Sequence, residues 1–295
     1  MMVPCSVPKT MVERYKQNLA QATHNTQRLF LFAGDQKIEH LNADFRGTPE
    51  AQLPAHLFAI ASKARIGVFA TQLGLIARYG SAYPTIPYLV KINAKTNLVG
   101  LDIDDPNSCD LVTIDDVIRL RDQSNLSILG VGMTIYLGSR YEGSMLARAA
   151  RLVLDAHQHG LLCVLWVYPR GKAVKNERSE DIIAGAAGVA HALGADFVKI
   201  NPPLTEHGEL SSKLLQQAAQ AAGNTGVLCS GGSLIEATAF LKILHEQLHI
   251  GGTDGSAVGR NIYQKKLPEA IAFCDAIARL VYDNADLATA LQKII

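Results

Sequence analysis

Short runs of aliphatic and β-branched residues alternate along the chain with longer segments whose apolar residues recur at helical spacing. This alternation is typical of βαβ units and a parallel sheet. Glycines lower the strand propensity of the last apolar run. The pattern predicts eight strands, at residues 28–34, 67–71, 88–93, 127–136, 161–168, 195–201, 225–230 and 251–258.

Helix starts lie between these strands. Thr113 is followed three residues later by Asp116, Ser179 precedes an apolar helical segment, and Pro268 stands at the start of another. Strands four to seven are apolar throughout, which indicates a sheet covered on both faces. Both a closed barrel and an open doubly wound sheet satisfy this pattern. No GxGxxG follows the first strand, and its absence favours a (β/α)8 TIM barrel.

The chain has 295 residues and shows no Pro/Ser-rich or charged linker. We therefore expect a single α/β domain, with residues 1–27 as an N-terminal extension and residues 28–295 as the barrel.

Charge and composition favour a small-molecule partner. The formal net charge is +1 with acids and bases interspersed, which argues against nucleic acid or a membrane surface as the partner. The first residues lack a basic region followed by an apolar stretch, so a cytoplasmic location is expected. The five cysteines are widely spaced with no CxxC pair, and most are expected to be buried thiols.

Lys199 is the first candidate for chemistry, because catalytic side chains of a barrel lie at the C-terminal ends of its strands. The two-residue period of a strand turns Lys199 inward with Phe197 and Asn201, and Val198 and Ile200 outward. Burial disfavours an ammonium ion, and a lysine with a lowered pKa can attack a ketone to form an imine. The alternative is a lysine that forms an ion pair or holds a phosphate.

Other strand ends supply partners for this lysine. Trp166 and Tyr168 point inward from strand five, and the tyrosine hydroxyl could transfer protons, or could simply be a hydrogen-bonded core group. Asp35 follows strand one and could bind a substrate hydroxyl or cap a helix. Lys91, if it points inward, is a second cation that lowers the pKa of Lys199 further, and it is also a candidate for binding the substrate or its phosphate.

Two glycine-containing segments follow strands seven and eight. Ser230, Gly231 and Gly232 lie in the first, and Gly259 and Arg260 in the second. Each segment is expected to expose backbone N–H groups at a helix start directly after its strand. Such groups, with an arginine, commonly bind phosphate at this end of a barrel, although tight turns would also explain the glycines. The arrangement predicts a phosphorylated substrate.

The segments GDQKIEH, YLVKINAKTNL, VLWVYPRG, ADFVKI, SGG and VGRNIYQ occur in this order between Arg28 and Tyr282. In this respect the chain resembles the archaeal-type class I fructose-bisphosphate aldolases. The resemblance implies a metal-independent lyase of glycolysis that forms a covalent imine on Lys199 without a cofactor, and a homo-oligomer. It implies Tyr168 as proton donor and acceptor, Trp166 beside it, Asp35 as the substrate-binding carboxylate, and a phosphate held by Ser230, Gly231, Gly232, Gly259 and Arg260.

Two departures from the family pattern leave the substrate open. Gln36 stands where the family usually has histidine, and Asp254 and Ser256 occupy a stretch that is normally glycine and alanine. Asp254 is expected to place a charge close to the phosphate site. The departures keep open two related Schiff-base activities, a thiolase-like reaction on a phosphorylated dione and a transaldol-type synthase.

Two further hypotheses come from other protein classes. His245, Glu246 and His249 spell HEQLH, a zinc hydrolase pattern, but this stretch is expected to end an outer helix at the bottom of the barrel. The second hypothesis is that the barrel has lost catalysis and serves as a scaffold.

Overall fold

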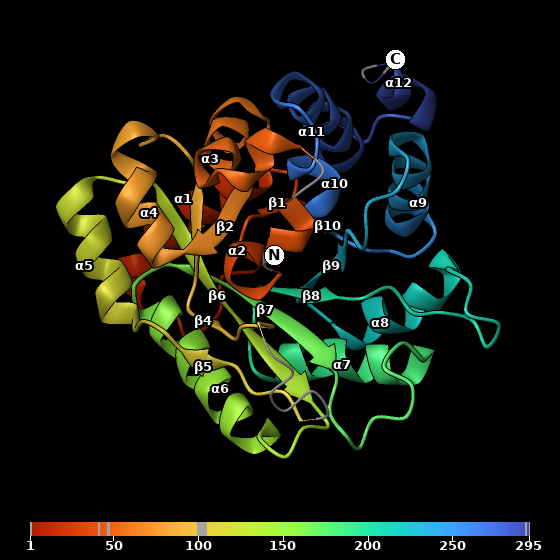
Figure 1. Cartoon of the computed structure of the whole chain (residues 1–295). Coiled ribbons are helices and arrows are strands. Elements are labelled where there is room, and N and C mark those ends of the chain that lie inside the picture. The colour runs from red at the N-terminus through yellow and green to blue at the C-terminus, as the bar shows by residue number, and fades with distance from the viewer. Residues whose placement is uncertain (1, 41, 46–47, 99–104, 293, 295) are drawn as a thin grey trace.

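The computed structural model describes residues 2–40, 42–45, 48–98, 105–292 and 294. Eight parallel strands close into a barrel in the order β1-β10-β9-β8-β7-β6-β3-β2 (Figure 1). Each coincides with a strand expected from the sequence, so the closed barrel is confirmed and the open sheet is wrong. The strands are β1 (Leu29–Ala33), β2 (Val68–Gln72), β3 (Tyr88–Lys91), β6 (Ile128–Leu137), β7 (Leu162–Pro169), β8 (Phe197–Ile200), β9 (Gly226–Ser230) and β10 (Gly255–Val258).

Helices surround the barrel and connect successive strands. The longer ones are α1 (Val12–Thr23), α3 (Pro54–Lys63), α5 (Ile114–Ser124), α6 (Glu142–Gln158), α7 (Glu180–Ala192), α9 (Ala237–His249) and α11 (Leu267–Tyr282). The shorter ones are α2 (Gln36–Glu39), α4 (Leu73–Tyr79), α8 (Leu215–Ala221), α10 (Arg260–Tyr263) and α12 (Leu287–Leu291). Short 3-10 helices cover Lys9–Met11, Asn42–Phe45, Pro49–Gln52, Gly80–Ala82 and Ser212–Leu214. A two-stranded antiparallel sheet, β4 (Asn93–Ala94) with β5 (Cys109–Asp110), lies between β3 and α5.

The expected helix starts are close to those observed. Thr113 and Asp116 form a reciprocal capping box at the start of α5. Ser179 precedes α7, although its side chain makes no capping hydrogen bond. Pro268 is in the first turn of α11, where a backbone N–H would have no intrahelical acceptor, so the proline costs no helical hydrogen bond.

Apolar residues divide into an inner and an outer core because neighbouring strand residues face opposite sides of the sheet. In β1, Leu29, Leu31 and Ala33 belong to the cluster inside the barrel, whereas Phe30 and Phe32 pack with the surrounding helices. Both cores consist of buried apolar side chains, and such interiors are normally close-packed.

The N-terminal helix α1 covers the bottom of the barrel, opposite the C-terminal strand ends. The hydroxyl of Tyr15 donates a hydrogen bond to Asp196, which precedes β8, over 2.5 Å. Asn18 donates to the carbonyl of Gly160, which precedes β7, over 2.8 Å. Tyr15 is fully buried in the inner core. Residues before Arg28 therefore pack against the barrel.

No helix in the described part of the chain is long and apolar enough to cross a membrane. All five cysteines are free; Cys163, Cys229 and Cys274 are buried, and Cys5 and Cys109 are exposed. The expectation that most cysteines are buried thiols is confirmed.

Candidate active site

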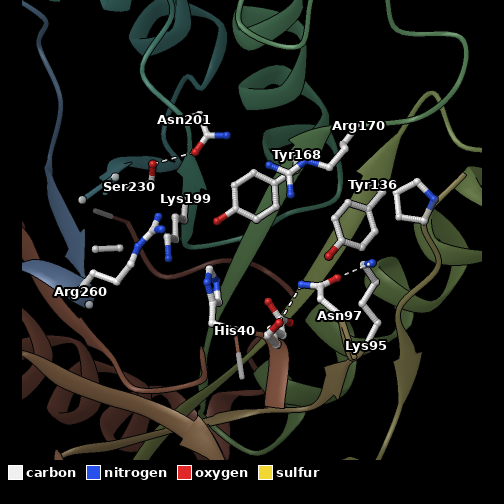
Figure 2. Close-up of a pocket in the computed structure, with 16 residues that line it drawn as sticks. His40, Lys95, Asn97, Tyr136, Tyr168, Arg170, Lys199, Asn201, Ser230 and Arg260 are labelled. Atoms are coloured by element: carbon white, nitrogen blue, oxygen red, sulfur yellow. Dashed lines mark hydrogen bonds between the residues drawn. The ribbon is translucent and has the colours of Figure 1, made fainter. Parts of the chain in front are cut away.

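A cavity of about 350 Å³ opens at the C-terminal ends of the strands, with Lys199 in its wall (Figure 2). Lys199 extends inward from β8, between the register partners Trp166 on β7 and Leu228 on β9. It is only 6% exposed. Val198 and Ile200, its neighbours in sequence, face the outer helices, as the two-residue period predicts.

Burial is the largest influence on the Lys199 amine and lowers its pKa. Asp35 and Glu39 oppose this effect, whereas the positive charges of Lys91 and Arg260 add to it, and the net direction is downward. In a larger fraction of the molecules, Lys199 is therefore an uncharged amine near neutral pH, and the uncharged amine is the form that attacks a carbonyl. Lys91 lowers the pKa of Lys199, as the sequence analysis predicted.

Trp166 lies close to both lysines but does not line the cavity. Its ring centroid lies 5.5 Å from Nζ of Lys199 and 5.1 Å from Nζ of Lys91. A Cβ atom at Gly132 would lie 2.2 Å from the indole ring, so the glycine in β6 makes room for the tryptophan. The indole Nε1 is buried and has no hydrogen-bond partner in the described part of the chain.

Lys91 is buried in β3 and lies between two carboxylates. Its Nζ is 3.6 Å from Oδ2 of Asp35 and 3.6 Å from Oε1 of Glu39, and it donates a hydrogen bond to the carbonyl of Asn93. Glu39 lines the cavity, whereas Asp35 and Lys91 do not. The assignment of Asp35 to substrate binding stays a prediction. The sequence reasoning missed Glu39, although its position one helical turn after Asp35 was a usable signal.

Tyr168 and Tyr136 form an aromatic wall on neighbouring strands. They are register partners of β7 and β6, and their ring centroids lie 6.4 Å apart. Burial, reinforced by the charges of Asp35 and Glu39, raises the pKa of the Tyr168 phenol well above its usual value. The phenol is therefore protonated at neutral pH and can donate a proton. Tyr136 also lines the cavity and was not anticipated from the sequence.

The expected phosphate-binding residues all line one end of the cavity: Ser230, Gly231, Gly232, Gly259 and Arg260. Gly232 has φ +67°, a turn that favours glycine. The N–H of Gly231 already donates to the carbonyl of Ala257, so it belongs to the barrel ladder and is not free for an anion. Six residues separate Ser230 from the start of α9, so the expected helix start directly after strand seven is wrong.

The opposite end of the cavity carries two basic side chains, Lys95 and Arg170, whereas His40 contacts the same Asp44 carboxylate as Arg260. Figure 2 shows Arg260 and Ser230 on one side of Lys199, and Arg170 and Lys95 on the other. Lys95 donates to Asn97 over 2.9 Å, and Arg170 pairs with Glu177 over 3.1 Å.

The expectation that Asp254 lies close to the phosphate site is wrong. Asp254 precedes β10, and its carboxylate accepts a hydrogen bond from the N–H of Val227, near the start of β9. Because the strands are parallel, residues that precede them gather at the bottom of the barrel, opposite the cavity. Ser256 is buried and donates to the carbonyl of Cys229. The side chain of Gln36, the other departure, lies outside the described part of the structure.

The HEQLH stretch ends α9 in the outer layer, as expected. The rings of His245 and His249 lie one turn apart, with centroids 4.4 Å from each other. Across the described residues, no group of three or more His, Cys, Asp or Glu side chains could hold a metal ion. Nothing in this geometry supports the zinc hydrolase hypothesis.

Comparison with known proteins places this site in a family. Residues 29–265 match the family described as DeoC/LacD family aldolase. The chain belongs to this family of aldolases. It is therefore a lyase, and the class of enzyme that the sequence motifs indicated is confirmed.

Individual relatives agree with this assignment. A Methanocaldococcus jannaschii protein named fructose-bisphosphate aldolase/6-deoxy-5-ketofructose 1-phosphate synthase is 52% identical, over 98% of this chain and 93% of its own length. The structure of a fructose-bisphosphate aldolase from Slackia heliotrinireducens is 50% identical, with a TM-score of 0.95 over 100% of this chain and 93% of that chain. An archaeal fructose-1,6-bisphosphate aldolase whose catalytic lysine is covalently bound to a carbinolamine intermediate is 31% identical, with a TM-score of 0.78 over 91% of this chain and 99% of that chain.

Proposed function

We propose that this aldolase cleaves and forms fructose 1,6-bisphosphate through an imine on Lys199, with dihydroxyacetone phosphate and glyceraldehyde 3-phosphate as the three-carbon partners. The observation that carries the proposal is a buried lysine of lowered pKa in a cavity with basic groups at both ends. A ketose with a phosphate at each end fits this distribution of charge.

Lys199 acts as the nucleophile towards the C2 ketone. Tyr168, protonated and in the same wall, donates its proton to the departing hydroxyl of the carbinolamine, regains a proton from solvent, and then donates that proton to C3 of the enamine. The indole ring of Trp166 lies within 5.5 Å of the Nζ atoms of both lysines. Lys91 repels the ammonium form of Lys199 and is itself held by Asp35.

The phosphate on C1 binds at the end of the cavity formed by Ser230, Gly231, Gly232, Gly259 and Arg260. The Arg260 guanidinium is partly exposed, and its contact with Asp44 is long at 3.9 Å, so its donors are available to a dianion. The binding energy of this remote group positions the carbonyl against Lys199, so its loss lowers turnover as well as affinity.

One experiment tests the nucleophile. Dihydroxyacetone phosphate with borohydride is expected to modify wild-type protein irreversibly on Lys199, as peptide mass spectrometry would show. Lys199→Met, which roughly conserves side-chain volume, is expected to remain folded and unmodified. An adduct on another lysine, or none on the wild type, would refute the mechanism. Unchanged activity after chelation of metals is expected as well.

A second experiment tests the phosphate end. Cleavage rates for fructose 1,6-bisphosphate, fructose 1-phosphate and fructose are compared in the wild type and in Arg260→Ala. The wild type is expected to lose kcat/KM when the C1 phosphate is missing, and Arg260→Ala to show a similar loss with the phosphorylated substrates. Efficient cleavage of fructose together with a silent Arg260→Ala would reopen the substrate class.

A second candidate activity is the synthesis of 6-deoxy-5-ketofructose 1-phosphate, which the name of the 52% identical relative supports. Breaking the C3–C4 bond of that product gives dihydroxyacetone phosphate and methylglyoxal, so both reactions share the phosphorylated enamine on Lys199 and differ only in the aldehyde. Supplying the enamine with either glyceraldehyde 3-phosphate or methylglyoxal, and comparing product formation, separates the two.

We further propose that the enzyme works in the cytoplasm as a homo-oligomer. Five free thiols and a phosphorylated substrate support the location. Cell fractionation and sedimentation equilibrium test the two statements.

A further inference from the structure

A second group of polar side chains lies at the bottom of the barrel, away from the cavity that holds Lys199. Ser6 comes from the segment before α1, His157 from the last turn of α6, and Asp196 from the residue before β8. Oγ of Ser6 lies 2.6 Å from Nδ1 of His157, and Nε2 of His157 lies 3.2 Å from Oδ2 of Asp196. The three side chains therefore form a continuous chain of hydrogen bonds.

The imidazole of His157 is in the position of a general base. An imidazole with its proton on Nε2 donates to Asp196 and leaves the lone pair of Nδ1 to accept from the Ser6 hydroxyl. The carboxylate of Asp196 also accepts from the Tyr15 hydroxyl over 2.5 Å and from the N–H of Cys163 over 2.7 Å. His157 is 1% exposed and Asp196 5%, so this buried network fixes the orientation of the ring. A hydroxyl, a base and a group that orients the base are the parts that activate a serine nucleophile.

Ser6 is less buried than its two partners and lies in a turn. It is partly exposed, and Gln158 fixes its main chain by donating to its carbonyl over 2.8 Å. The N–H of Val7 donates to the carbonyl of Pro4 and closes a turn with Cys5 and Ser6 at its centre. Within the described part of the chain, the N–H groups of Cys5 and Ser6 donate to no acceptor. Free N–H groups beside a nucleophile are available to stabilise the oxyanion that forms when it attacks a carbonyl.

A small cavity of about 270 Å³ adjoins this turn. Val3, Pro4 and Cys5 line it from the N-terminal segment, and Tyr15 and Asp196 line it from α1 and from the start of β8. Apolar side chains and this small volume suit a short hydrocarbon chain. None of the lining residues also lines the cavity of the aldolase site, so ligands of the two cavities do not compete.

We propose that Ser6, His157 and Asp196 form a second catalytic centre, which hydrolyses esters of short-chain carboxylic acids. Ser6 is the nucleophile, His157 is first the general base and then the general acid, and Asp196 is a positioning residue that acts through His157. The second centre is independent of the aldolase reaction, because it uses no residue that lines the cavity around Lys199. It gives the segment before α1 a role beyond packing against the barrel.

The reaction balances with water as the only co-reactant. Nδ1 of His157 takes the proton of the Ser6 hydroxyl while Oγ attacks the ester carbonyl, whose electron pair moves onto its oxygen. When the carbonyl forms again, the bond to the alcohol oxygen breaks, and the alcohol leaves with the proton from His157. Water then attacks the acyl-serine and gives a proton to His157, and the Ser6 oxygen leaves with that proton. The products are a carboxylic acid and an alcohol, and both side chains return to their starting state.

A fluorophosphonate probe tests the nucleophile directly. Oγ of an activated serine displaces fluoride from phosphorus and keeps the phosphonyl group, so peptide mass spectrometry locates the residue that reacted. The wild type is expected to carry the adduct on Ser6.

Turnover is measured with the p-nitrophenyl esters of acetate, butyrate and decanoate. The assay uses the wild type and also Lys199→Met, in which the buried amine cannot react with the ester. Acetate and butyrate esters are expected to release several equivalents of p-nitrophenol per chain. The decanoate ester is expected to react poorly, because a cavity of about 270 Å³ is too small for its chain.

Matched variants separate catalysis from packing. Ser6→Ala is expected to abolish labelling and to lower ester hydrolysis about a hundredfold or more, and His157→Gln is expected to lower both rates similarly, since general bases contribute roughly that much. Asp196→Asn is expected to lower kcat with little change in KM, a split that a loss of packing alone would not produce. Ser62→Ala removes an exposed hydroxyl from α3 and is expected to leave labelling and hydrolysis unchanged.

The wild type decides first, because its adduct needs no variant to fold. An adduct on Cys5 or on any residue other than Ser6, no adduct at all, or no turnover of the short esters would overturn the second catalytic centre. Hydrolysis at the wild-type rate by folded Ser6→Ala would do the same. In each of these cases the contacts of Ser6 with His157 only anchor the N-terminal segment. Melting curves establish which variants are folded, and if His157→Gln or Asp196→Asn unfolds, the site of the adduct and Ser6→Ala still give the answer.

Discussion

Replacing Lys91 by methionine provides a sharp test of how this site activates its nucleophile. The Nζ atoms of Lys91 and Lys199 lie 5.1 and 5.5 Å from the centroid of the same indole ring, so they are at most roughly 11 Å apart. Two unit charges at that separation repel each other by about 1.5 kcal/mol at an effective dielectric constant of about 20. Lys91→Met removes this repulsion, and it also leaves Asp35 and Glu39 without their counter-ion.

Both consequences favour the ammonium form of Lys199. Its pKa is therefore expected to rise, and the share of uncharged amine at neutral pH to fall about tenfold, since about 1.4 kcal/mol corresponds to a factor of ten. Because only the amine attacks the ketone, the rate of imine formation is expected to fall at neutral pH and to recover as the pH rises. The variant is also expected to be less stable by about 3–5 kcal/mol, because it leaves buried carboxylates unpaired.

The assay is the pH dependence of C3 proton exchange in dihydroxyacetone phosphate, measured on folded protein for the wild type and the variant. Lys63→Met, which removes an exposed charge at the end of α3, serves as the control and is expected to follow the wild-type profile. A profile for Lys91→Met that coincides with the wild type, or that shifts to lower pH, would show that Lys91 does not tune Lys199.

Three other parts of the molecule carry further predictions. Tyr168→Phe is expected to lower kcat about a hundredfold with little change in KM, as measured by steady-state kinetics, because the lost phenol transfers protons; equal effects on both would assign it to binding. Asp254→Asn is expected to leave the KM for fructose 1,6-bisphosphate unchanged, since that carboxylate lies at the bottom of the barrel. Tyr15→Phe is expected to cost about 1.5–3 kcal/mol in urea unfolding, because its hydroxyl donates to the buried Asp196. The pKa of Tyr15 is raised by burial and then by Asp196, so this stability is present below the usual tyrosine pKa and is lost as the pH rises above it; a melting temperature that increases above pH 10 would contradict this.

The sequence pattern was enough to predict the barrel and the direction of its inward side chains. Strand periodicity is a local property, since successive side chains face opposite sides whatever the rest of the chain does. Lys199, Trp166 and Tyr168 could therefore be placed inside the barrel from the sequence alone. Burial followed from the same pattern, and with it the lowered pKa of the lysine.

Which side chains meet across the barrel depends on the tertiary structure. Asp254 and Arg260 are six residues apart in sequence, yet they lie at opposite ends of the barrel, because Asp254 precedes β10 and Arg260 follows it. Glu39 and Tyr136 reach the cavity because α2 turns over the mouth and because β6 is the register partner of β7. Such contacts depend on closure of the barrel and on the path of the loops. The spacing of Glu39 from Asp35 is a local signal, but the side chains that Glu39 and Tyr136 meet lie on elements far apart in the chain, and no local pattern predicts those contacts.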